Sequence, residues 1–118
     1  MIIRLRRAAI VSARMDEHRR FERERCMPML RKQPGFLGVL FLRYAEYHAS
    51  SLTFWEDGGA VEALQSSPSY RRIARELAAS GLLAGDQSVE VLEIEGGDLR
   101  PEAIVRALGG TRNPPWPG

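Results

Sequence analysis

The chain has one cysteine, two histidines and one lysine among its 118 residues. A single cysteine, Cys26, excludes an internal disulfide and is typical of a protein in a reducing cytoplasm. With no cysteine pair and only His18 and His48, we expect no structural metal site. No apolar run approaches the length that crosses a membrane, and the basic N-terminus does not resemble a signal peptide. We therefore predict a cytoplasmic protein that does not contact membranes.

A large excess of charge of one sign is also missing. The calculated pI is near 9.1, but the net charge is only +2, because the sixteen arginines alternate with Asp and Glu. Nucleic-acid-binding proteins gather basic residues into a patch or stripe. The mixed pattern therefore predicts a solvated surface and no nucleic-acid partner.

The order of periodic segments predicts an α+β fold. Ile2 to Ile10 is expected to form a strand. A helix capped by Ser12 should run to about Lys32, with Pro28 kinking or restarting it. Three further strands are expected at 36–44, 51–55 and 88–95, after turns at Pro34-Gly35, 46–51 and Gly85-Asp86. With a second helical region between the last two strands, the order is βαββαβ, the ferredoxin-like arrangement with an antiparallel sheet.

The stretch from Leu52 to Leu77 organises the rest of the chain. A short strand ends at Trp55, and Asp57 is placed to cap a short helix that follows. Ser67-Pro68 then restarts the helix, with serine as the cap and proline at the first helical position. Tyr70 begins an apolar face that continues through Ile73 and Leu77 at helical spacing. A strand-end tryptophan beside this helix predicts a place for a flat ligand.

The strand at 36–44, FLGVLFLRY, is apolar at both odd and even positions. An antiparallel strand with one wet face should alternate instead. Both faces are therefore expected to be covered, one by the helices of this chain and the other by a partner. A homodimer is the simplest solution, since twofold dimers are the commonest oligomers.

We predict one ferredoxin-like domain over residues 1–97 and a C-terminal appendage over 98–118. A short helix should run from Pro101 to Leu108, and the Pro- and Gly-rich end from Thr111 to Gly118 is expected to be disordered.

Three stretches, PGFLGVLFLR at 34–43, LTFWED at 52–57 and AVEALQSSPSYRRI at 60–73, resemble the antibiotic biosynthesis monooxygenase family. Their order and spacing match the family over residues 2–95. The resemblance implies a dimeric α+β barrel. It also implies a cofactor-independent monooxygenase, which uses dioxygen to oxidise a phenolic or polyketide-like small molecule.

The same family resemblance extends to haem-degrading members, but two of their residues are missing here. Those members carry a ligand histidine four residues after the aromatic that matches Tyr70, and this position is Ala74. They also carry an asparagine on the first strand, and none lies between Ile2 and Ile10. Haem loses its anchor without an axial imidazole. We therefore expect no cofactor.

The candidate site residues lie at the ends of the central strands and on the second helical region. Trp55, Phe54 and Tyr44 are candidates for substrate binding. Tyr70, His48 and Arg43 are candidates for orienting or deprotonating the substrate.

Each candidate also has a purely structural interpretation. Trp55 and Tyr70 are equally typical of core packing, His48 of a solvated turn, and Arg43 of a rim or dimer ion pair. His18, between Glu17 and Arg19, is predicted to lie on the surface, and Cys26 to be a small packing residue.

Two other function classes remain open. The same fold can serve as a non-catalytic small-molecule-binding or interaction module. It can also serve as a polyketide cyclase or isomerase that works by acid–base chemistry without oxygen. A binding module should bind its ligand without consuming dioxygen, and a cyclase should turn over anaerobically.

Overall fold

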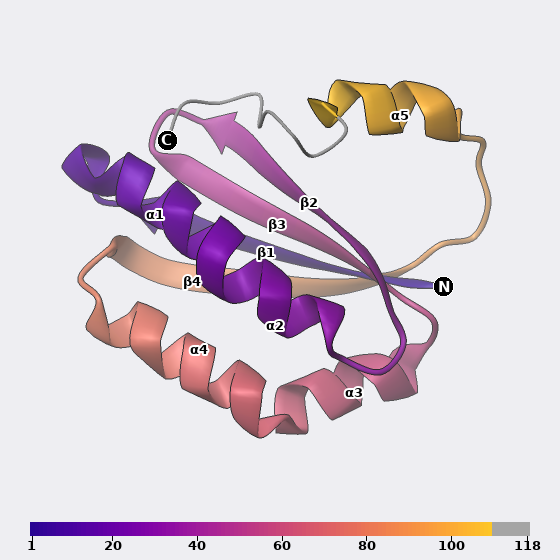
Figure 1. Ribbon diagram of the computed structural model, residues 1–118, viewed down its shortest axis with the longest axis horizontal. Helices are drawn as coiled ribbons and strands as arrows, with labels where there is room; N and C mark the ends of the chain where they lie inside the picture. Colours follow the sequence, from indigo (N-terminus) through magenta and orange to yellow (C-terminus); the bar gives the residue numbers. More distant parts are fainter. Residues whose placement is uncertain (110–118) are drawn as a thin grey trace.

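The computed structural model describes residues 1–109. Four strands, β1 (Ile2–Ile10), β2 (Phe36–Ala45), β3 (His48–Trp55) and β4 (Leu83–Glu93), form one antiparallel sheet in the order β2-β3-β1-β4 (Figure 1). Helices lie between β1 and β2 and between β3 and β4. The predicted ferredoxin-like βαββαβ fold is confirmed.

The first helical region is built from four short pieces. These are η1 (Ser12–Arg14), α1 (Met15–Phe21), a wider π-type turn η2 (Glu22–Cys26) and α2 (Met27–Arg31). Pro28 stands at the start of α2 and cannot donate to the carbonyl of Glu24, so the preceding turn widens. The predicted restart at Pro28 is confirmed. Ser12 makes no side-chain capping bond, so that prediction is wrong.

Two strands are longer at their N-terminal ends than their sequences indicate. β3 begins at His48, so the turn before it is only Glu46 and Tyr47, with Tyr47 at φ 59°. β4 begins at Leu83, and the predicted turn Gly85-Asp86 therefore lies inside the strand. Leu83 pairs with Ile10, and the register shifts before Ala8 pairs with Gln87. This long-range pairing outweighs the local turn preference.

Both caps predicted in the second helical region are confirmed. Asp57 accepts a hydrogen bond from the backbone N–H of Ala60 at 2.9 Å, at the start of α3 (Gly58–Ser66). Ser67 accepts from the N–H of Tyr70 at 3.4 Å, at the start of α4 (Pro68–Ala79). The broken helix therefore aims α4 back along the sheet, with Ile73 and Leu77 buried beneath it.

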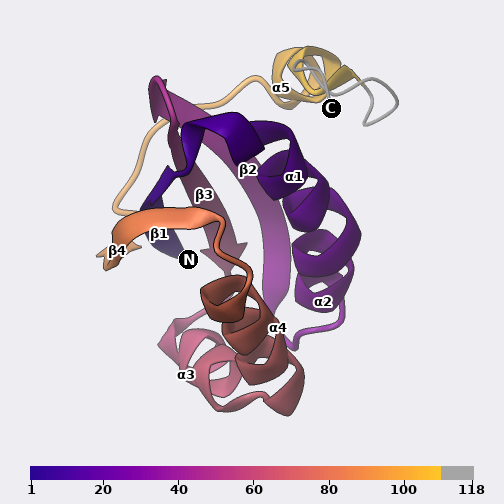
Figure 2. The same ribbon diagram turned by 90° about the vertical axis from the view of Figure 1, so that its left-hand side faces the viewer.

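The helices α1 to α4 pack on one face of the curved sheet (Figure 2). The main core lies between this face and the helices, where Trp55 and Leu64 are fully buried. A smaller cluster of Ala8, Ile10 and Ala49 fills the other end of the same layer.

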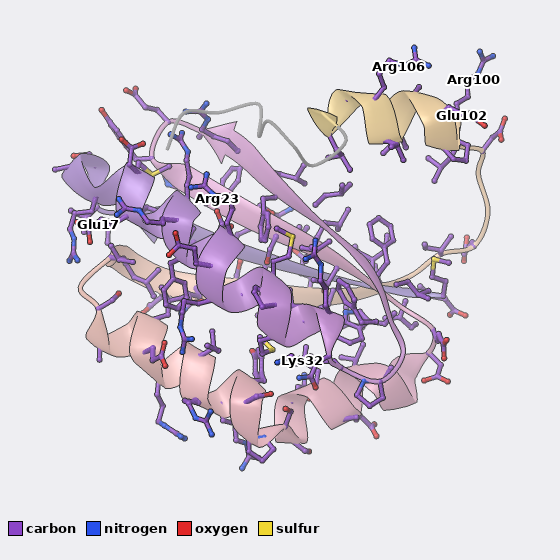
Figure 3. The ribbon with its side chains drawn as sticks, in the orientation of Figure 1. Glu17, Arg23, Lys32, Arg100, Glu102 and Arg106 are labelled. Atoms are coloured by element: carbon purple, nitrogen blue, oxygen red, sulfur yellow. The ribbon has the colours of Figure 1, made fainter. Side chains whose placement is uncertain are left out.

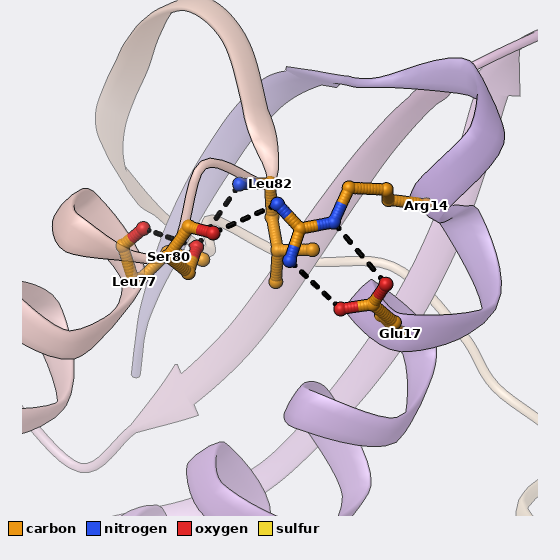
Figure 4. A network of polar contacts seen from close by, with 5 residues as sticks. All are labelled: Arg14, Glu17, Leu77, Ser80 and Leu82. Atoms are coloured by element: carbon orange, nitrogen blue, oxygen red, sulfur yellow. Dashed lines mark hydrogen bonds and ion pairs between the residues drawn. The ribbon is translucent and has the colours of Figure 1, made fainter.

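A polar network joins the beginning of α1 to the end of α4 (Figure 4). Arg14 donates from Nη1 to the carbonyl oxygen of Ser80 at 2.8 Å and pairs with Glu17 through its other nitrogens. Ser80 Oγ donates to the carbonyl of Leu77 and accepts from the N–H of Leu82. The network holds the start of α1 and the end of α4 together, at the point where the helical layer meets the sheet.

The opposite face of the sheet carries no helix of the α1–α4 layer (Figure 2). Two rows of side chains cross this outer face. One row comprises Leu40, Leu52 and Leu5, and the other Phe54, Ile3 and Leu92. Leu92 is 45% exposed. Both rows are apolar, no helix of the α1–α4 layer covers them, and the ion pair of Arg7 with Glu90 lies on the same face.

The short helix α5 (Pro101–Ala107) follows β4 after a connecting segment and lies apart from the helical layer (Figure 1). Arg100 and Arg106 extend on its side remote from the sheet (Figure 3). The predicted disordered segment Thr111–Gly118 falls outside the described residues. No helix of residues 1–109 is long and apolar enough to cross a membrane.

Candidate active site

A cavity of about 290 Å³ lies between the helical layer and the sheet. Its apolar walls come from Phe21 and Leu30 on the first helical region, from Ile73 and Leu77 on α4, and from Phe41 on β2. Its polar lining residues come from every side, and are Arg4, Arg6, His18, Glu22, Cys26, Ser51, Thr53, Tyr70 and Gln87. An apolar pocket with a few converging polar groups is the usual form of a small-molecule site.

Tyr70 and Arg4 form the most ordered polar contact in the cavity. Nη2 of Arg4 donates to the Tyr70 hydroxyl at 2.8 Å, and the guanidinium carbon lies 5.4 Å from the centroid of the Tyr70 ring. Arg4 lies on β1 and Tyr70 in the first turn of α4. Since the hydroxyl oxygen accepts from Arg4, its own hydrogen is available to a ligand.

Arg6 lies two residues along β1, on the same face of the sheet as Arg4. Its Nε donates to Oε1 of Gln87 on the neighbouring strand β4. Burial lowers the pKa of the Arg6 guanidinium, because the charged form loses its hydration. Of the several effects on this pKa, burial is the largest. The Nε of Arg4 is buried and has no hydrogen-bond partner among residues 1–109. The sheet thus presents two arginines to the cavity.

His18 and Glu22 face each other one helical turn apart, with Nδ1 and Oε1 3.5 Å from one another. Burial, with a smaller contribution from the neighbouring Arg6 and Arg19, lowers the pKa of His18 to about 4. Burial raises the pKa of Glu22 to about 8, against the opposing effect of the same two arginines. At neutral pH the pair is therefore mostly an uncharged imidazole beside a protonated carboxyl.

Cys26 is half-buried at the edge of the cavity. Burial raises the pKa of its thiol to about 12, and the nearby Glu22 adds to this effect. The thiol is protonated at neutral pH and is a poor nucleophile.

Three polar contacts tie the two helical walls of the cavity together. Arg14 bonds the Ser80 carbonyl at one end, and Gln33 donates to Ser69 at 3.1 Å at the other. Between them, Arg25 on η2 makes a two-pronged ion pair with Glu76 on α4, at 2.6 and 3.0 Å. We call this ion pair the latch. It spans the seam between the walls on the solvent side.

Trp55 and Phe54 were both expected to bind substrate, but neither lines this cavity. Trp55 is fully buried in the main core, where its Nε1 donates to Thr53 Oγ1 at 2.8 Å and its ring meets Phe36 edge-on. Phe54 follows Thr53 in the strand and points to the outer face, because neighbouring strand residues alternate. Thr53 therefore connects the cavity to Trp55.

Tyr44, His48 and Arg43 lie at the far end of the β2–β3 hairpin, away from Tyr70. The Tyr44 ring is exposed and lies 5.3 Å from the imidazole of His48, measured between ring centroids. The Nδ1 of His48 contacts the carbonyl of Glu46 at 2.8 Å. Arg43 lines a small hollow of about 30 Å³ that shares His18 and Glu22 with the large cavity. Of the predicted catalytic residues, only Tyr70 lines the large cavity.

The prediction that His18 lies on the surface is wrong, because it is 2% exposed. Arg4, Arg6 and Glu22 were not singled out at all. One signal was present in the sequence: Arg4 and Arg6 share the strand face of Ile2, Ala8 and Ile10. Inward apolar residues on both sides of these arginines already indicate that they face the core.

Ala74 also lines the cavity. Among residues 1–109, no three His, Cys, Asp or Glu side chains are grouped so that they could hold a metal ion.

Comparison with known proteins gives structural matches alone. No family model matches the chain, and no curated protein matches it by sequence. The fold matches a monooxygenase from the gene ActVA-Orf6 of Streptomyces coelicolor, in complex with nanaomycin D. That match has a TM-score of 0.73 at 15% identity over 84% of this chain and 91% of the other.

Two more solved structures show the range of proteins that share this architecture. An antibiotic biosynthesis monooxygenase matches with a TM-score of 0.66 at 15% identity, over 81% of this chain and all of the other. A Nitrosomonas europaea protein of unknown function matches with a TM-score of 0.69 at 13% identity, over 84% and 93%. The chain thus has the fold of the antibiotic biosynthesis monooxygenases. Identities this low establish the fold and not the reaction.

Proposed function

We propose that the protein is a cofactor-independent monooxygenase that acts on a phenolic or polyketide-like aromatic molecule. The observation that carries the proposal is the cavity in which the Tyr70 hydroxyl, held by Arg4, meets an apolar surround. A reaction between an electron-rich phenol and dioxygen needs this kind of site: one that binds a ring, orients its oxygen and limits water.

Each group of the site has a distinct task in this proposal. Ile73 and Leu77 on one side and Phe41 on the other enclose the ring of the substrate. The Tyr70 hydroxyl donates its free hydrogen to a substrate oxygen, and Arg4 stabilises negative charge there. This lowers the cost of forming the phenolate, which is the species that donates electrons to dioxygen.

For an anthrone-type phenol the reaction balances without any cofactor. The ring carbon loses two hydrogens and gains one oxygen atom as a new carbonyl. The second oxygen atom leaves as water with those two hydrogens. The substrate supplies all four electrons that reduce dioxygen, so the protein has only to bind, orient and handle a proton.

The solved structures support this choice of substrate class. The Streptomyces coelicolor monooxygenase that shares the fold was crystallised with nanaomycin D.

We also propose that the protein forms a homodimer through the outer face of its sheet. Leu40, Leu52 and Leu5 lie side by side across three strands of this face. An apolar sheet face of this kind normally packs against a second layer, and none of the helices α1 to α4 covers it.

Dioxygen uptake by the metal-stripped protein, measured with a panel of anthrone- and hydroquinone-type phenols, tests the proposal. We expect uptake above the spontaneous rate, and a drop of about tenfold or more in Tyr70→Phe, which removes one transition-state hydrogen bond. Tyr44→Phe is the matched control, because Tyr44 is exposed and lies outside the cavity.

Three outcomes separate the function classes. Uptake that falls in Tyr70→Phe alone supports the oxygenase. Ligand binding without uptake overturns it in favour of the binding module. Turnover of a polyketide-like substrate at the same rate under argon overturns it in favour of a cyclase or isomerase.

A further inference from the structure

We infer that the cavity binds its aromatic ligand as an anion, with the acidic group of the ligand placed between Arg4 and Arg6. This deepens the proposed function, on which it rests for the place and aromatic nature of the substrate. It narrows the ligand to a planar aromatic molecule that carries one ionised carboxyl or phenol.

The first observation is that the two arginines of the cavity have no carboxylate partner. Arg7, Arg14 and Arg25 each form an ion pair with a glutamate on the protein surface. Within residues 1–109, neither Arg4 nor Arg6 has a carboxylate oxygen within ion-pair distance. Both instead bond neutral groups, the Tyr70 hydroxyl and the Gln87 amide oxygen.

The second observation is an unused donor. Arg4 is 7% exposed, and its buried Nε has no hydrogen-bond partner in the part of the chain that the structure describes. A buried donor without an acceptor costs free energy, and a buried charge without a counter-charge costs more. A ligand oxygen that carries negative charge would remove both costs at once. A neutral ring would remove neither.

The third observation concerns Glu22, the one carboxyl group among the described residues that line the cavity. Because burial raises its pKa to about 8, it is mostly protonated at neutral pH and does not neutralise the arginines. His18, with a pKa of about 4, is uncharged there. The charged or titratable groups around Glu22 and the arginines are Arg19 and His18 on α1, Cys26 on η2 and Tyr70 on α4. The cavity is thus cationic at neutral pH.

The volume and the walls of the cavity determine the size of the ligand and the apolar character of its remaining part. About 290 Å³ is at the lower end of small-molecule sites, which span roughly 300–1,000 Å³. Apolar walls lie on both sides of the cavity, with Ile73 and Leu77 on α4 and Phe41 on β2. One acidic group on a small aromatic ring system satisfies both halves of the site.

Calorimetry with two isosteric probes tests the inference. The probes are 2-naphthoate, which is ionised at neutral pH, and the uncharged 2-naphthamide. We expect 2-naphthoate to bind at least about tenfold more tightly, since hydrogen bonds to a charged group are the stronger ones. Equal affinities, or tighter binding of the amide, would overturn the inference. This comparison needs only the unmodified protein.

Charge-removing variants then locate the acidic group. Arg4→Gln and Arg6→Gln should each weaken 2-naphthoate binding about tenfold and leave 2-naphthamide binding within a factor of about two. The matched control is Arg7→Gln, because Arg7 follows Arg6 on the same strand but points to the outer face and pairs with Glu90. An equal loss in Arg7→Gln would contradict the assignment. Arg6→Lys, which keeps the charge, should retain most of the affinity even if a Gln variant unfolds.

The protonation of Glu22 gives a second, independent readout. As the pH rises through about 8, Glu22 gains a negative charge beside the arginines, so the affinity for 2-naphthoate should fall. The fall should be absent in Glu22→Gln. A wild-type affinity that is unchanged between about pH 6 and about pH 9, where this carboxyl titrates, would contradict the charge balance described above.

A coloured probe separates the two kinds of acidic group. If the site stabilises phenolates, 4-nitrophenol should bind with its apparent pKa lowered, which is visible as absorbance of the phenolate. Naphthoate binding with no such shift would identify the ligand as a carboxylate, and both results support an anion site. These binding measurements involve no oxygen chemistry, so failure of the dioxygen-uptake assay leaves their outcome intact.

Discussion

Glu22 and His18 have opposite effects on how stability depends on pH. Glu22 keeps its proton up to about pH 8 in the folded protein, whereas the unfolded chain releases it near the ordinary value of a glutamate. It therefore stabilises the folded state at low pH, and this stabilisation is lost as pH rises through about 8. His18 stays unprotonated in the folded protein down to about pH 4, so its burial destabilises the folded state as pH falls below about 6.5.

Between about pH 6.5 and about pH 8, only Glu22 contributes to this linkage. We expect the free energy of unfolding to fall there with a slope of at most about 1.4 kcal/mol per pH unit. Glu22→Gln should remove that slope, as measured by urea denaturation at several pH values. Glu24→Gln, an exposed glutamate two residues away, is the control and should keep it. Parallel profiles for the wild type and Glu22→Gln would contradict the assignment.

The Thr53 hydroxyl is the hydrogen-bond partner of the buried indole of Trp55. It accepts from Trp55 Nε1 and donates to the carbonyl of Arg4. Thr53→Val keeps the shape but leaves the indole N–H without an acceptor, and we expect a loss of roughly 1–3 kcal/mol in the free energy of unfolding. Thr53→Ser keeps the hydroxyl and should lose less. Equal losses in the two variants would show that the methyl group matters more than the hydrogen bond.

At the scale of elements, the sequence predicts those features that depend on neighbours in the chain. The caps Asp57 and Ser67 and the restart at Pro28 follow from residues one to four positions apart, and all three are as expected. The start of β4 is different from the prediction, because Leu83 pairs in the sheet with Ile10, which is distant in sequence. The local turn preference of Gly85-Asp86 contains no information about that long-range pairing.

The connection between α4 and β4 depends on Gly81, which has φ +75° and whose added Cβ would lie 2.9 Å from Arg14 Nη1. Gly81→Ala should destabilise the protein by roughly 1–2 kcal/mol, because the left-handed backbone is strained for alanine. The same substitution at Gly85, where an added Cβ meets nothing within 4 Å, should be close to neutral. Thermal unfolding of the two variants side by side measures the difference, and equal melting temperatures would contradict it.

At the scale of the whole molecule, the apolar pattern of β2 predicts that both faces of the sheet are covered. Helices cover one face, and none of the helices α1 to α4 covers the outer face. Light scattering on a gel-filtration peak should give about twice the chain mass of 13.3 kDa. Leu52→Asp places a charge in the middle of the outer face and should shift the mass to that of one chain. Ala78→Asp, on the exposed side of α4, is the control.

A clean monomer for the wild-type protein would contradict the dimer proposal.

The candidate site was only partly predictable, for a physical reason. Tyr70 could be placed because its helix has a clear apolar face. Trp55 was correctly placed at the end of its strand, but the core closes over it completely. His18 and Glu22 stand among surface-like charges in the sequence, and only the widened turn η2 and the packing of α4 bury them. Their environment is a property of the assembled layers.

The latch between Arg25 and Glu76 should affect the rates at which a ligand enters and leaves the cavity, and not the affinity of the ligand. Both side chains remain partly in water, at 48% and 38% exposure, so the ion pair contributes little to stability. It nevertheless bridges the two helical walls of the cavity, and we propose that a ligand enters between them. If the latch is closed both before and after binding, Arg25→Gln should speed entry and escape by the same factor. The residence time would shorten while the dissociation constant stays the same, and stopped-flow mixing with 2-naphthoate at one ionic strength measures both.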